Sequence, residues 1–332
     1  MRRAIEMTLI GFLLLLVAYF AAGYAIYTRL AKVRGGCDKH LANRPDNFTN
    51  INNWPAKEFA PYFMPTYEEV RFPSRQPGLQ IGGWYVEADP NAPVIIVIEG
   101  LGGCKYAQGA LLPAGILWHS GLNVLLIDLR DTGESDSENG YSTIGNKEYL
   151  DALGAWDWLV QEKGFAPELI GMYGNSLGAA TVLFAFQHEP RVAAIALNSP
   201  FANLPQIIRE EMVNNGFPRL LALGAIFMGK VVSGQSLVAH NPVDALLSAG
   251  DRAIWVVHSK SDARIAVHHS YDLQAAAQQA GLNATFWFID GVDHIQAPGT
   301  YPEEFQARLS EFFRANLRSR TPRGGGGETS TR

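Results

Sequence analysis

Cysteine is scarce in this chain, with only Cys37 and Cys104 among 332 residues. Two cysteines are too few for a disulfide framework or a cysteine-rich metal site, and they do not fix the redox compartment. Cys37 follows an apolar stretch, where palmitoylation is one interpretation, but we expect an ordinary free cysteine. An excess of positive charge is also lacking, since 27 Lys and Arg face 32 Asp and Glu. This balance argues against nucleic acid as the main partner.

Charge is absent altogether from residues 9–27. A stretch of this length can just cross a bilayer as a helix. The alternative is a cleaved signal peptide with Ala21 and Gly23 at a poor cleavage site, but the apolar run is long for one. Basic residues flank the run on both sides, so the positive-inside rule does not decide the orientation. We assign residues 1–34 to a single-pass membrane anchor and its flanks, and expect their removal to leave a soluble, active enzyme.

The rest of the chain has ordinary globular composition and is long enough for one large domain. Residues 35–67 are rich in Asn, Pro and Gly without a clear period, which predicts a loosely packed linker. From 68 to 317 apolar runs of strand length alternate with helical patterns. This alternation predicts an α/β fold with a mostly parallel sheet and helices on both faces. The alternation breaks at 201–249, where we expect a short helical lid, and 318–332 is expected to be a disordered tail.

The segment Gly174-Asn175-Ser176-Leu177-Gly178 has the pattern G-x-S-x-G. An apolar run of strand length precedes it and a run of good helix formers follows. In that context the pattern predicts a nucleophile elbow, whose glycines permit a strained turn that pushes the serine out of the sheet. The helix N-terminus behind the serine favours negative charge. A glycine-rich turn with an incidental serine is the alternative, and the flanking strand and helix disfavour it.

A nucleophilic serine needs a base, and the base needs an acid that orients it. Asp262 follows the strand expected at 254–258, and His294 follows the last expected strand. Both loops should lie at the carboxyl ends of parallel strands, the edge of the sheet that also carries Ser176. The chain order serine, aspartate, histidine is that of an α/β-hydrolase triad. We therefore expect Ser176, Asp262 and His294 to be catalytic.

Other carboxylates and histidines fit these roles less well. Asp290 and Asp293 stand beside His294 in the chain, and loop neighbours seldom reach the far ring nitrogen. Asp244 has the context of a helix cap. His258 ends a strand near the expected acid, and we interpret it as a residue that shapes the loop. His268 and His269 fall on an expected helix and His119 and His188 near helix ends, where surface or capping roles are expected.

Stabilising an oxyanion requires two preorganised N–H groups. One should come from Leu177, directly after the nucleophile. The other should come from the glycine-rich loop at 99–103, where Leu101 is the expected donor. A phosphate-binding loop is the alternative, but the Lys-Ser/Thr of a P-loop is lacking. No motif implies a cofactor or a metal.

From about residue 68 to 317 these motifs resemble the α/β-hydrolase superfamily of serine hydrolases, most closely its compact membrane-anchored esterase or peptidase-like members. The turn at 128–135 resembles the D-x-R-G-x-G-x-S turn of the family, with Asp131 in place of a glycine. Glu99 stands where many members have histidine. The resemblance implies cleavage of an ester, thioester or amide through a covalent acyl-enzyme.

Two other functions stay open at this point. The chain could be a non-catalytic binding protein that retained the fold, or it could transfer the acyl group to an acceptor other than water. The lid segment carries these apolar residues: Phe201, Leu204, Ile207, Ile208, Phe217, Leu220, Leu221, Ile226, Phe227 and Met228. We expect them to form a wall over Ser176 that favours medium acyl chains. The alternative is that they seal the core or touch the bilayer.

Overall fold

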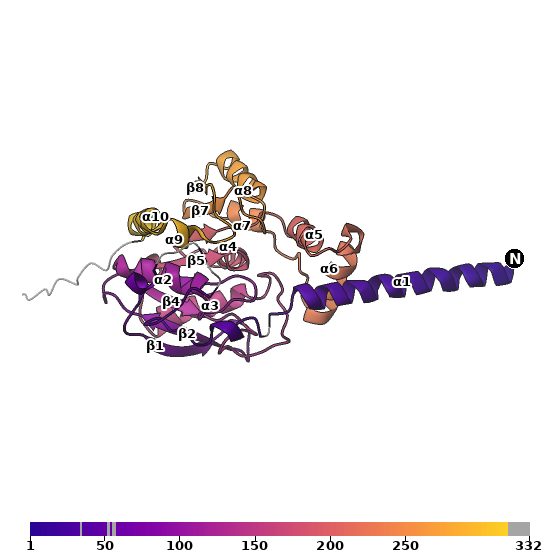
Figure 1. The fold of residues 1–332 in the computed structure, drawn as a ribbon, viewed down its shortest axis with the longest axis horizontal. Coiled ribbons are helices and arrows are strands. Elements are labelled where there is room, and N and C mark those ends of the chain that lie inside the picture. Colours follow the sequence, from indigo (N-terminus) through magenta and orange to yellow (C-terminus); the bar gives the residue numbers. More distant parts are fainter. Residues whose placement is uncertain (34, 52–53, 55–57, 318–332) are drawn as a thin grey trace, which may run out of the picture.

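The computed structural model describes residues 1–33, 35–51, 54 and 58–317 (Figure 1). The tail expected at 318–332 lies outside the described residues. Eight strands form one sheet: β1 (Glu68–Pro73), β2 (Gln80–Val86), β3 (Val94–Ile98), β4 (Asn123–Ile127), β5 (Ile170–Asn175), β6 (Ala194–Asn198), β7 (Ala253–Ser259) and β8 (Ala284–Ile289). The order is β1-β2-β4-β3-β5-β6-β7-β8. Strand β2 runs antiparallel to both of its neighbours, β1 and β4. The strands from β4 to the far edge, in the order β4-β3-β5-β6-β7-β8, pair in parallel.

Helices cover both faces of this sheet and so confirm the predicted α/β architecture. The apolar core of one face includes side chains of α3 (Tyr149–Gln161), α4 (Leu177–His188), α7 (Pro242–Leu247) and α8 (His268–Gln279). The core of the other face includes side chains of α2 (Gln108–His119), α9 (Ala297–Thr300) and α10 (Pro302–Asn316). Every residue of the central strand β3 is buried. Burial between two layers of helices explains why this strand is a continuous apolar run.

The segment expected to form a lid contains α5 (Leu204–Asn214), the short η4 (Arg219–Leu221), α6 (Ala222–Ser233) and α7. Its first helix begins at a sequence-encoded cap, because the Asn203 side chain accepts from the Gln206 N–H at 3.0 Å. The last turn of α6 ends at Gly234 in the left-handed conformation, with φ of 70°. We call α5, η4 and α6 together the cap.

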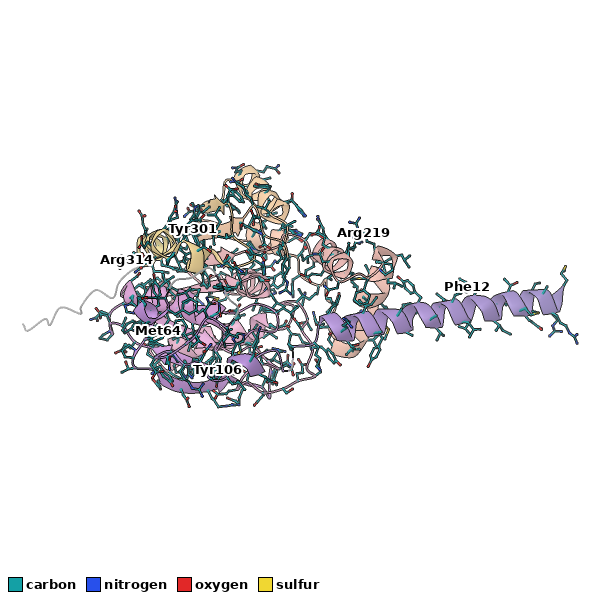
Figure 2. The ribbon with its side chains drawn as sticks, viewed as in Figure 1. Phe12, Met64, Tyr106, Arg219, Tyr301 and Arg314 are labelled. Atoms are coloured by element: carbon teal, nitrogen blue, oxygen red, sulfur yellow. A yellow bond between two sulfur atoms is a disulfide. The ribbon has the colours of Figure 1, made fainter. Side chains whose placement is uncertain are left out.

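The apolar N-terminal stretch forms α1 (Arg2–Leu30), which is long and apolar enough to cross a membrane. Its first half projects away from the domain, with Phe12 on the free part (Figures 1 and 2). Its second half packs along α6, and Ile26 and Tyr27 are buried there. The helix α1 is therefore held to the domain by side-chain packing as well as by its covalent connection.

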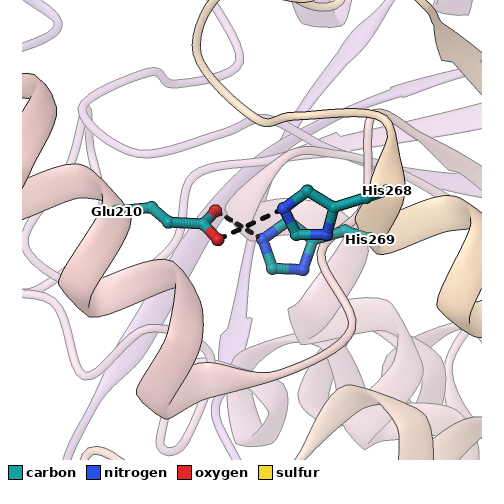
Figure 3. A group of neighbouring side chains, drawn as sticks. All are labelled: Glu210, His268 and His269. Atoms are coloured by element: carbon teal, nitrogen blue, oxygen red, sulfur yellow. Dashed lines mark hydrogen bonds and ion pairs between the residues drawn. The ribbon is translucent and has the colours of Figure 1, made fainter.

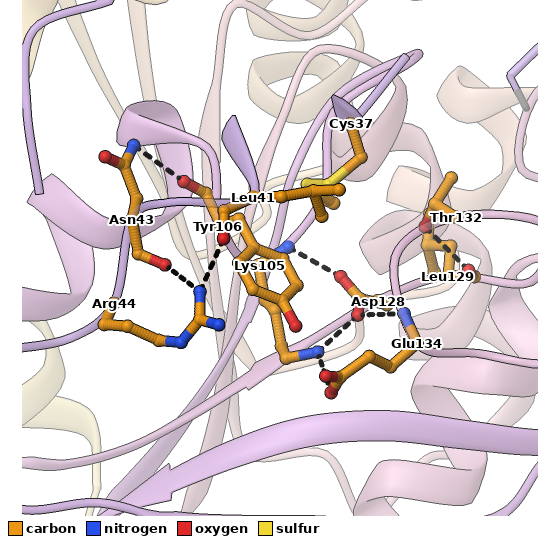
Figure 4. The surroundings of a disulfide bond; sticks show 11 residues. Cys37, Leu41, Asn43, Arg44, Lys105, Tyr106, Asp128, Leu129, Thr132 and Glu134 are labelled. Carbon is orange, nitrogen blue, oxygen red and sulfur yellow. Dashed lines mark hydrogen bonds and ion pairs between the residues drawn. A yellow bond between two sulfur atoms is a disulfide. The ribbon is translucent and has the colours of Figure 1, made fainter. Parts of the chain in front are cut away.

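The described residues of 35–67 pack more tightly than the composition of the segment suggests. They contain the short helices η1 (Asp38–His40) and η2 (Ala60–Tyr62), and Phe48 and Met64 are fully buried in the core. The expectation of free cysteines is wrong, because Cys37 and Cys104 form a disulfide (Figure 4). The bond joins the segment after α1 to the end of the glycine-rich loop.

Candidate active site

Ser176 stands at a strained turn between β5 and α4. Its φ is 53°, in the left-handed region that non-glycine residues seldom adopt. The Ser176 N–H donates to the Asn198 carbonyl of β6 at 2.8 Å. A Cβ atom on Gly174 would lie 2.3 Å from the carbonyl oxygen of Gly178, and one on Gly178 would lie 2.5 Å from that of Ile98. The two glycines of the motif are thus required for strand and helix to meet closely enough to hold this turn.

The glycine-rich loop after β3 lies directly against the serine. A Cβ atom on Gly100 would be 3.2 Å from the Ser176 Cβ. Leu177 is the first residue of α4, so its N–H has no acceptor within the helix. Within the described part of the chain, the N–H groups of Leu101 and Leu177 donate no hydrogen bond. Two unengaged donors therefore flank the serine, as an oxyanion site requires.

Asp262 and His294 meet across the loops that follow β7 and β8. The His294 Nδ1 atom lies 2.8 Å from Asp262 Oδ2, and Asp262 Oδ1 accepts from the N–H groups of Arg264 and Ile265. The other ring nitrogen, His294 Nε2, is buried and has no hydrogen-bond partner among the described residues. Ser176 and His294 line the same cavity. The structure thus brings the three sequence-predicted residues to one edge of the sheet.

The Asp262 carboxyl group is held in its ionised form. Burial alone would raise its pKa, but hydrogen bonds from His258 and His294 and the charge of His294 bring it well below the usual range. His258 is fully buried; its Nε2–H donates to the Ile265 carbonyl at 2.9 Å and lies 3.3 Å from Asp262 Oδ2. Its Nδ1 accepts from the Ser270 hydroxyl at 2.6 Å. These contacts agree with the predicted role of His258 in shaping the loop.

Two cavities meet at Ser176. The first is apolar and is also lined by Leu101 and Leu177. The second is more polar and is lined by His294, Lys39, His40 and the loop 99–103. A substrate bound across the serine would thus place one end among apolar side chains and the other among polar ones.

The comparisons with known proteins agree with this architecture. A family model for the prolyl oligopeptidase family matches residues 114–320, more than half of the chain. The chain belongs to the prolyl oligopeptidase family. Esterase Pf2001 of Pyrococcus furiosus superposes with a TM-score of 0.63 at 21% identity, covering 83% of this chain and 98% of that one. The α/β hydrolase GrgF of a Penicillium species gives 0.61 at 18% identity, covering 76% and 99%. At these identities the structures establish the α/β-hydrolase fold alone.

Several relatives share part of the chain at similar identity. A Mycobacterium tuberculosis protein is 28% identical, covering 66% of this chain and 69% of its own. Thiohydrolase aneE of Aspergillus aculeatus is also 28% identical, over 51% of this chain and 52% of its own length. Polyketide transferase ATR5 of Stachybotrys chlorohalonatus is 31% identical over 41% and 45%. The chain thus spans about half the length of these two fungal relatives.

Residues of α1 line the apolar cavity, and sequence reasoning missed them. Ile26, Tyr27, Leu30 and Ala31 belong to its wall. The membrane-helix pattern of the stretch concealed this second role, because an anchor and a buried wall have the same apolar composition. Of the apolar residues expected to form the wall over Ser176, Phe201, Ile207 and Ile208 line the cavity, whereas Phe217, Phe227 and Met228 do not. The segment 201–249 also contributes Met212, Ala225 and Leu237.

Glu210, His268 and His269 form a cluster outside this site, with ligand atoms within 4.8 Å of one another (Figure 3). Its hydrogen bonds hold α5 against α8 and do not favour a metal site. His269 Nδ1 accepts from the Ala202 N–H at 3.3 Å, so its Nε2 carries the proton and donates to Glu210 at 2.9 Å. A metal at Nε2 would move the proton to Nδ1, where it would face the Ala202 donor.

Proposed function

We propose that the chain is a serine hydrolase in which Ser176 is the nucleophile, His294 the base and Asp262 the residue that orients it. One observation carries the proposal. The 2.8 Å hydrogen bond from His294 to Asp262 leaves the opposite ring nitrogen buried and unpartnered, in a cavity that Ser176 also lines. An imidazole fixed at one nitrogen and free at the other is the arrangement that a base needs.

In the proposed reaction, His294 Nε2 takes the Ser176 proton while Oγ attacks an acyl carbonyl. The oxyanion that forms accepts hydrogen bonds from the N–H groups of Leu101 and Leu177. The imidazolium returns its proton to the leaving alcohol, thiol or amine as the acyl-enzyme forms. Water then attacks the acyl-enzyme with the same base, which releases the acid and restores the serine. The ionised Asp262 stabilises the imidazolium in both halves.

The apolar cavity supports an ester or thioester with a hydrocarbon acyl chain over a peptide. Its wall is made mostly of apolar side chains, and the charged residues on it, Glu211 and Arg264, pair with each other at 3.1 Å. A peptide backbone would need polar partners along its whole length. We further propose that α1 anchors the chain in a membrane and that the hydrolase domain extends over 68–317, with its cap within 201–249. The segment 35–67 belongs with this domain, because its side chains are part of the core.

Labelling with a fluorophosphonate tests the assignment of the nucleophile. The wild-type chain should be labelled and should hydrolyse esters, and Ser176→Ala should abolish both while the melting temperature stays unchanged. Ser120→Ala is the matched control. That serine is also buried, but its hydroxyl donates to the Ile116 carbonyl of α2 and it lines neither cavity. An unlabelled, inactive but folded wild-type protein would favour the non-catalytic binding function.

Acyl transfer to an acceptor other than water is the second candidate. A relative of 31% identity is named a polyketide transferase, and the polar cavity could hold an acceptor beside the acyl-enzyme. With a trapped acyl-enzyme, mass spectrometry of the products separates the two cases. Faster decay on addition of an alcohol or amine, with the acyl group appearing on that acceptor, would support transfer.

A further inference from the structure

The apolar cavity is bounded by the helix that is long enough to span a membrane. Its wall combines α1, the cap and the floor at Ser176 and Leu177. On α1 the lining residues lie at the end nearest the domain, including Ile26, which is 3% exposed. The same helix is thus long enough to span a membrane and forms part of the cavity wall. The position of α1 in the bilayer therefore indicates where the substrate comes from.

Specific contacts fix α1 to α6. The Tyr19 hydroxyl accepts from the Gly224 N–H and donates to the Leu220 carbonyl, both at 3.0 Å. It thereby satisfies one of the free donors in the first turn of α6. The helices approach so closely that a Cβ atom on Gly23 would lie 2.5 Å from the Gly224 carbonyl carbon. Such close approach of small residues is typical of helix pairs in membranes.

The length of α1 places this contact inside the bilayer. A hydrocarbon core of about 30 Å needs about 20 helical residues, and the uncharged run covers 9–27. The contacts with the cap begin at Tyr19 and continue to Tyr27. Only 9–18 are left clear of the cap, and at 1.5 Å per residue they cover roughly 15 Å. If α1 spans the bilayer, the packed part of α1 and the adjoining face of α6 lie at membrane depth.

The outer face of the cap suits that position. Four large apolar side chains are exposed on it, and α6 meets the aromatic part of α1 where the rings of Phe20 and Phe227 lie 4.9 Å apart. The exposed side chains are Leu220, Leu223, Phe227 and Val231. Leu223, Phe227 and Val231 recur at helical spacing, and so form one stripe along α6. Such a stripe is costly in water and is stabilised in lipid.

We propose that the apolar cavity, whose wall α1 and α5 share, takes the acyl chain of an ester resident in the bilayer. The proposal rests on the proposed function of Ser176 and names the source and class of its substrate. The chain of the lipid passes from hydrocarbon to an apolar wall without crossing water, and its ester carbonyl reaches Ser176. The polar portion then occupies the second cavity. Hydrolysis consumes one water and yields a fatty acid and an alcohol.

Photocrosslinking in vesicles tests the route directly. Full-length Ser176→Ala is reconstituted in phosphatidylcholine vesicles that carry a lipid ester with a diazirine near the end of its acyl chain. After irradiation, peptide mass spectrometry should find label on 26–31, at the end of α1, and on 207–212 of α5. Label confined to 9–17 and the exposed stripe of α6 would overturn the proposal, because it would show contact with lipid at the outer surface only.

A pair of variants tests the same proposal by activity. Ile26→Trp should fill the cavity beside α1, whereas Val17→Trp changes the same helix at a position that is 59% exposed to its surroundings. We expect Ile26→Trp to lower kcat/KM for long-chain lipid esters at least tenfold, since two excluded methylenes are worth about that factor. The Val17→Trp control should keep the wild-type activity on long-chain and acetate esters and the wild-type fluorophosphonate labelling.

The outcomes separate failure of this proposal from failure of the proposed function. If the wild-type chain takes up fluorophosphonate but Ile26→Trp and Val17→Trp share its chain-length profile, the bilayer route is wrong and the nucleophile stands. If no labelling of Ser176 occurs, the proposed function fails, and the crosslinking result still decides whether the cavity binds lipid. Should Ile26→Trp fail to fold, the crosslinking experiment decides alone.

Discussion

At the scale of single residues, the loops after β7 and β8 contain three carboxylates near His294, and their geometry separates them. Asp262 Oδ2 is bonded to the ring, whereas Asp293 Oδ1 accepts from the backbone N–H groups of Ala263 and His294. Asp290 pairs with the exposed Lys260. Only Asp262 is therefore placed to control which nitrogen of His294 carries the proton.

Asp262→Asn should lower kcat about 10⁴-fold, because an amide at this position stabilises the wrong tautomer of the imidazole. Asp293→Asn is the matched control on the same loop and should reduce kcat far less. Steady-state kinetics with a soluble ester measures both, and thermal unfolding verifies that each variant is folded. If Asp293→Asn lowered kcat and Asp262→Asn did not, the assignment of Asp262 as the orienting acid would be wrong.

Glu99 presents a different problem, since it is a buried acid at the start of the loop that approaches Ser176. Burial raises its pKa to about 7, against an ordinary 4.5, although the Gly100 N–H and Asn175 act in the opposite direction. His294 lines the same cavity as Glu99. Below pH 7 the neutral acid leaves the proposed oxyanion site free of a repelling charge.

The folded state holds the Glu99 proton up to about pH 7, whereas the unfolded chain releases it near 4.5. Stability should therefore fall as pH rises between these values and remain at the lower level above them, by on the order of 3 kcal/mol at most. Glu99→Gln removes the ionisation. Its free energy of unfolding should match the wild type near pH 4.5 and exceed it at pH 8. Equal stabilities at both pH values would refute the raised pKa.

At the scale of elements, much of the architecture could be predicted from the sequence because each strand and helix has its own local pattern. The buried β3 is a continuous β-branched run, and the elbow carries its glycines in a fixed order. Even the departure at Asp131 has a local cause. Its φ is 65°, and its carboxylate accepts from the N–H groups of Glu138 and Gly140, so an aspartate can occupy a left-handed position that favours glycine.

Contacts between distant elements could not be predicted in this way. Cys37 and Cys104 are 67 residues apart, and no local pattern relates them. The apolar composition of α1 indicates burial or lipid, but it does not say which helix packs against it. For that reason the expectation that 1–34 are dispensable is revised: Ile26 and Tyr27 belong to the packed structure and to the wall of the cavity.

Two glycines of α1 provide a test of its packing on the cap. A Cβ atom on Gly23 would clash with the backbone of Gly224, whereas one on Gly11 would meet nothing within 4 Å. Gly23→Val should separate α1 from α6 at a cost of about 1–3 kcal/mol. Tryptic cleavage after the exposed Arg219 and Lys230 should then be roughly 5- to 100-fold faster in detergent. Trypsin should cleave Gly11→Val at the wild-type rate. Equal cleavage rates for the two variants would contradict the packing of α1 on α6.

At the scale of the whole molecule, the disulfide joins the loop beside the proposed active site to the segment that follows the proposed membrane anchor. Cys104 follows the loop 99–103, and Cys37 follows α1 by a few residues. The backbone is close here as well, since a Cβ atom on Gly36 would lie 2.4 Å from the Gly102 carbonyl oxygen. Beside the bond, the buried Lys105 pairs with Asp128 at 2.6 Å (Figure 4). Closing a loop of this length typically contributes about 2–4 kcal/mol.

The same bond determines which side of the membrane the domain should occupy. Disulfides persist in oxidising compartments and are rare in the cytosol, and Cys37 lies on the domain side of α1. The domain should therefore face the oxidising side, with the basic residues before α1 on the cytosolic side, as the positive-inside rule favours. Protease added to intact cells should remove an epitope tag at the C-terminus and spare one at the N-terminus until detergent is added. Without reductant, neither cysteine should react with a maleimide. A protected C-terminal tag together with two reactive thiols would place the domain in the cytosol and show that the bond does not form there.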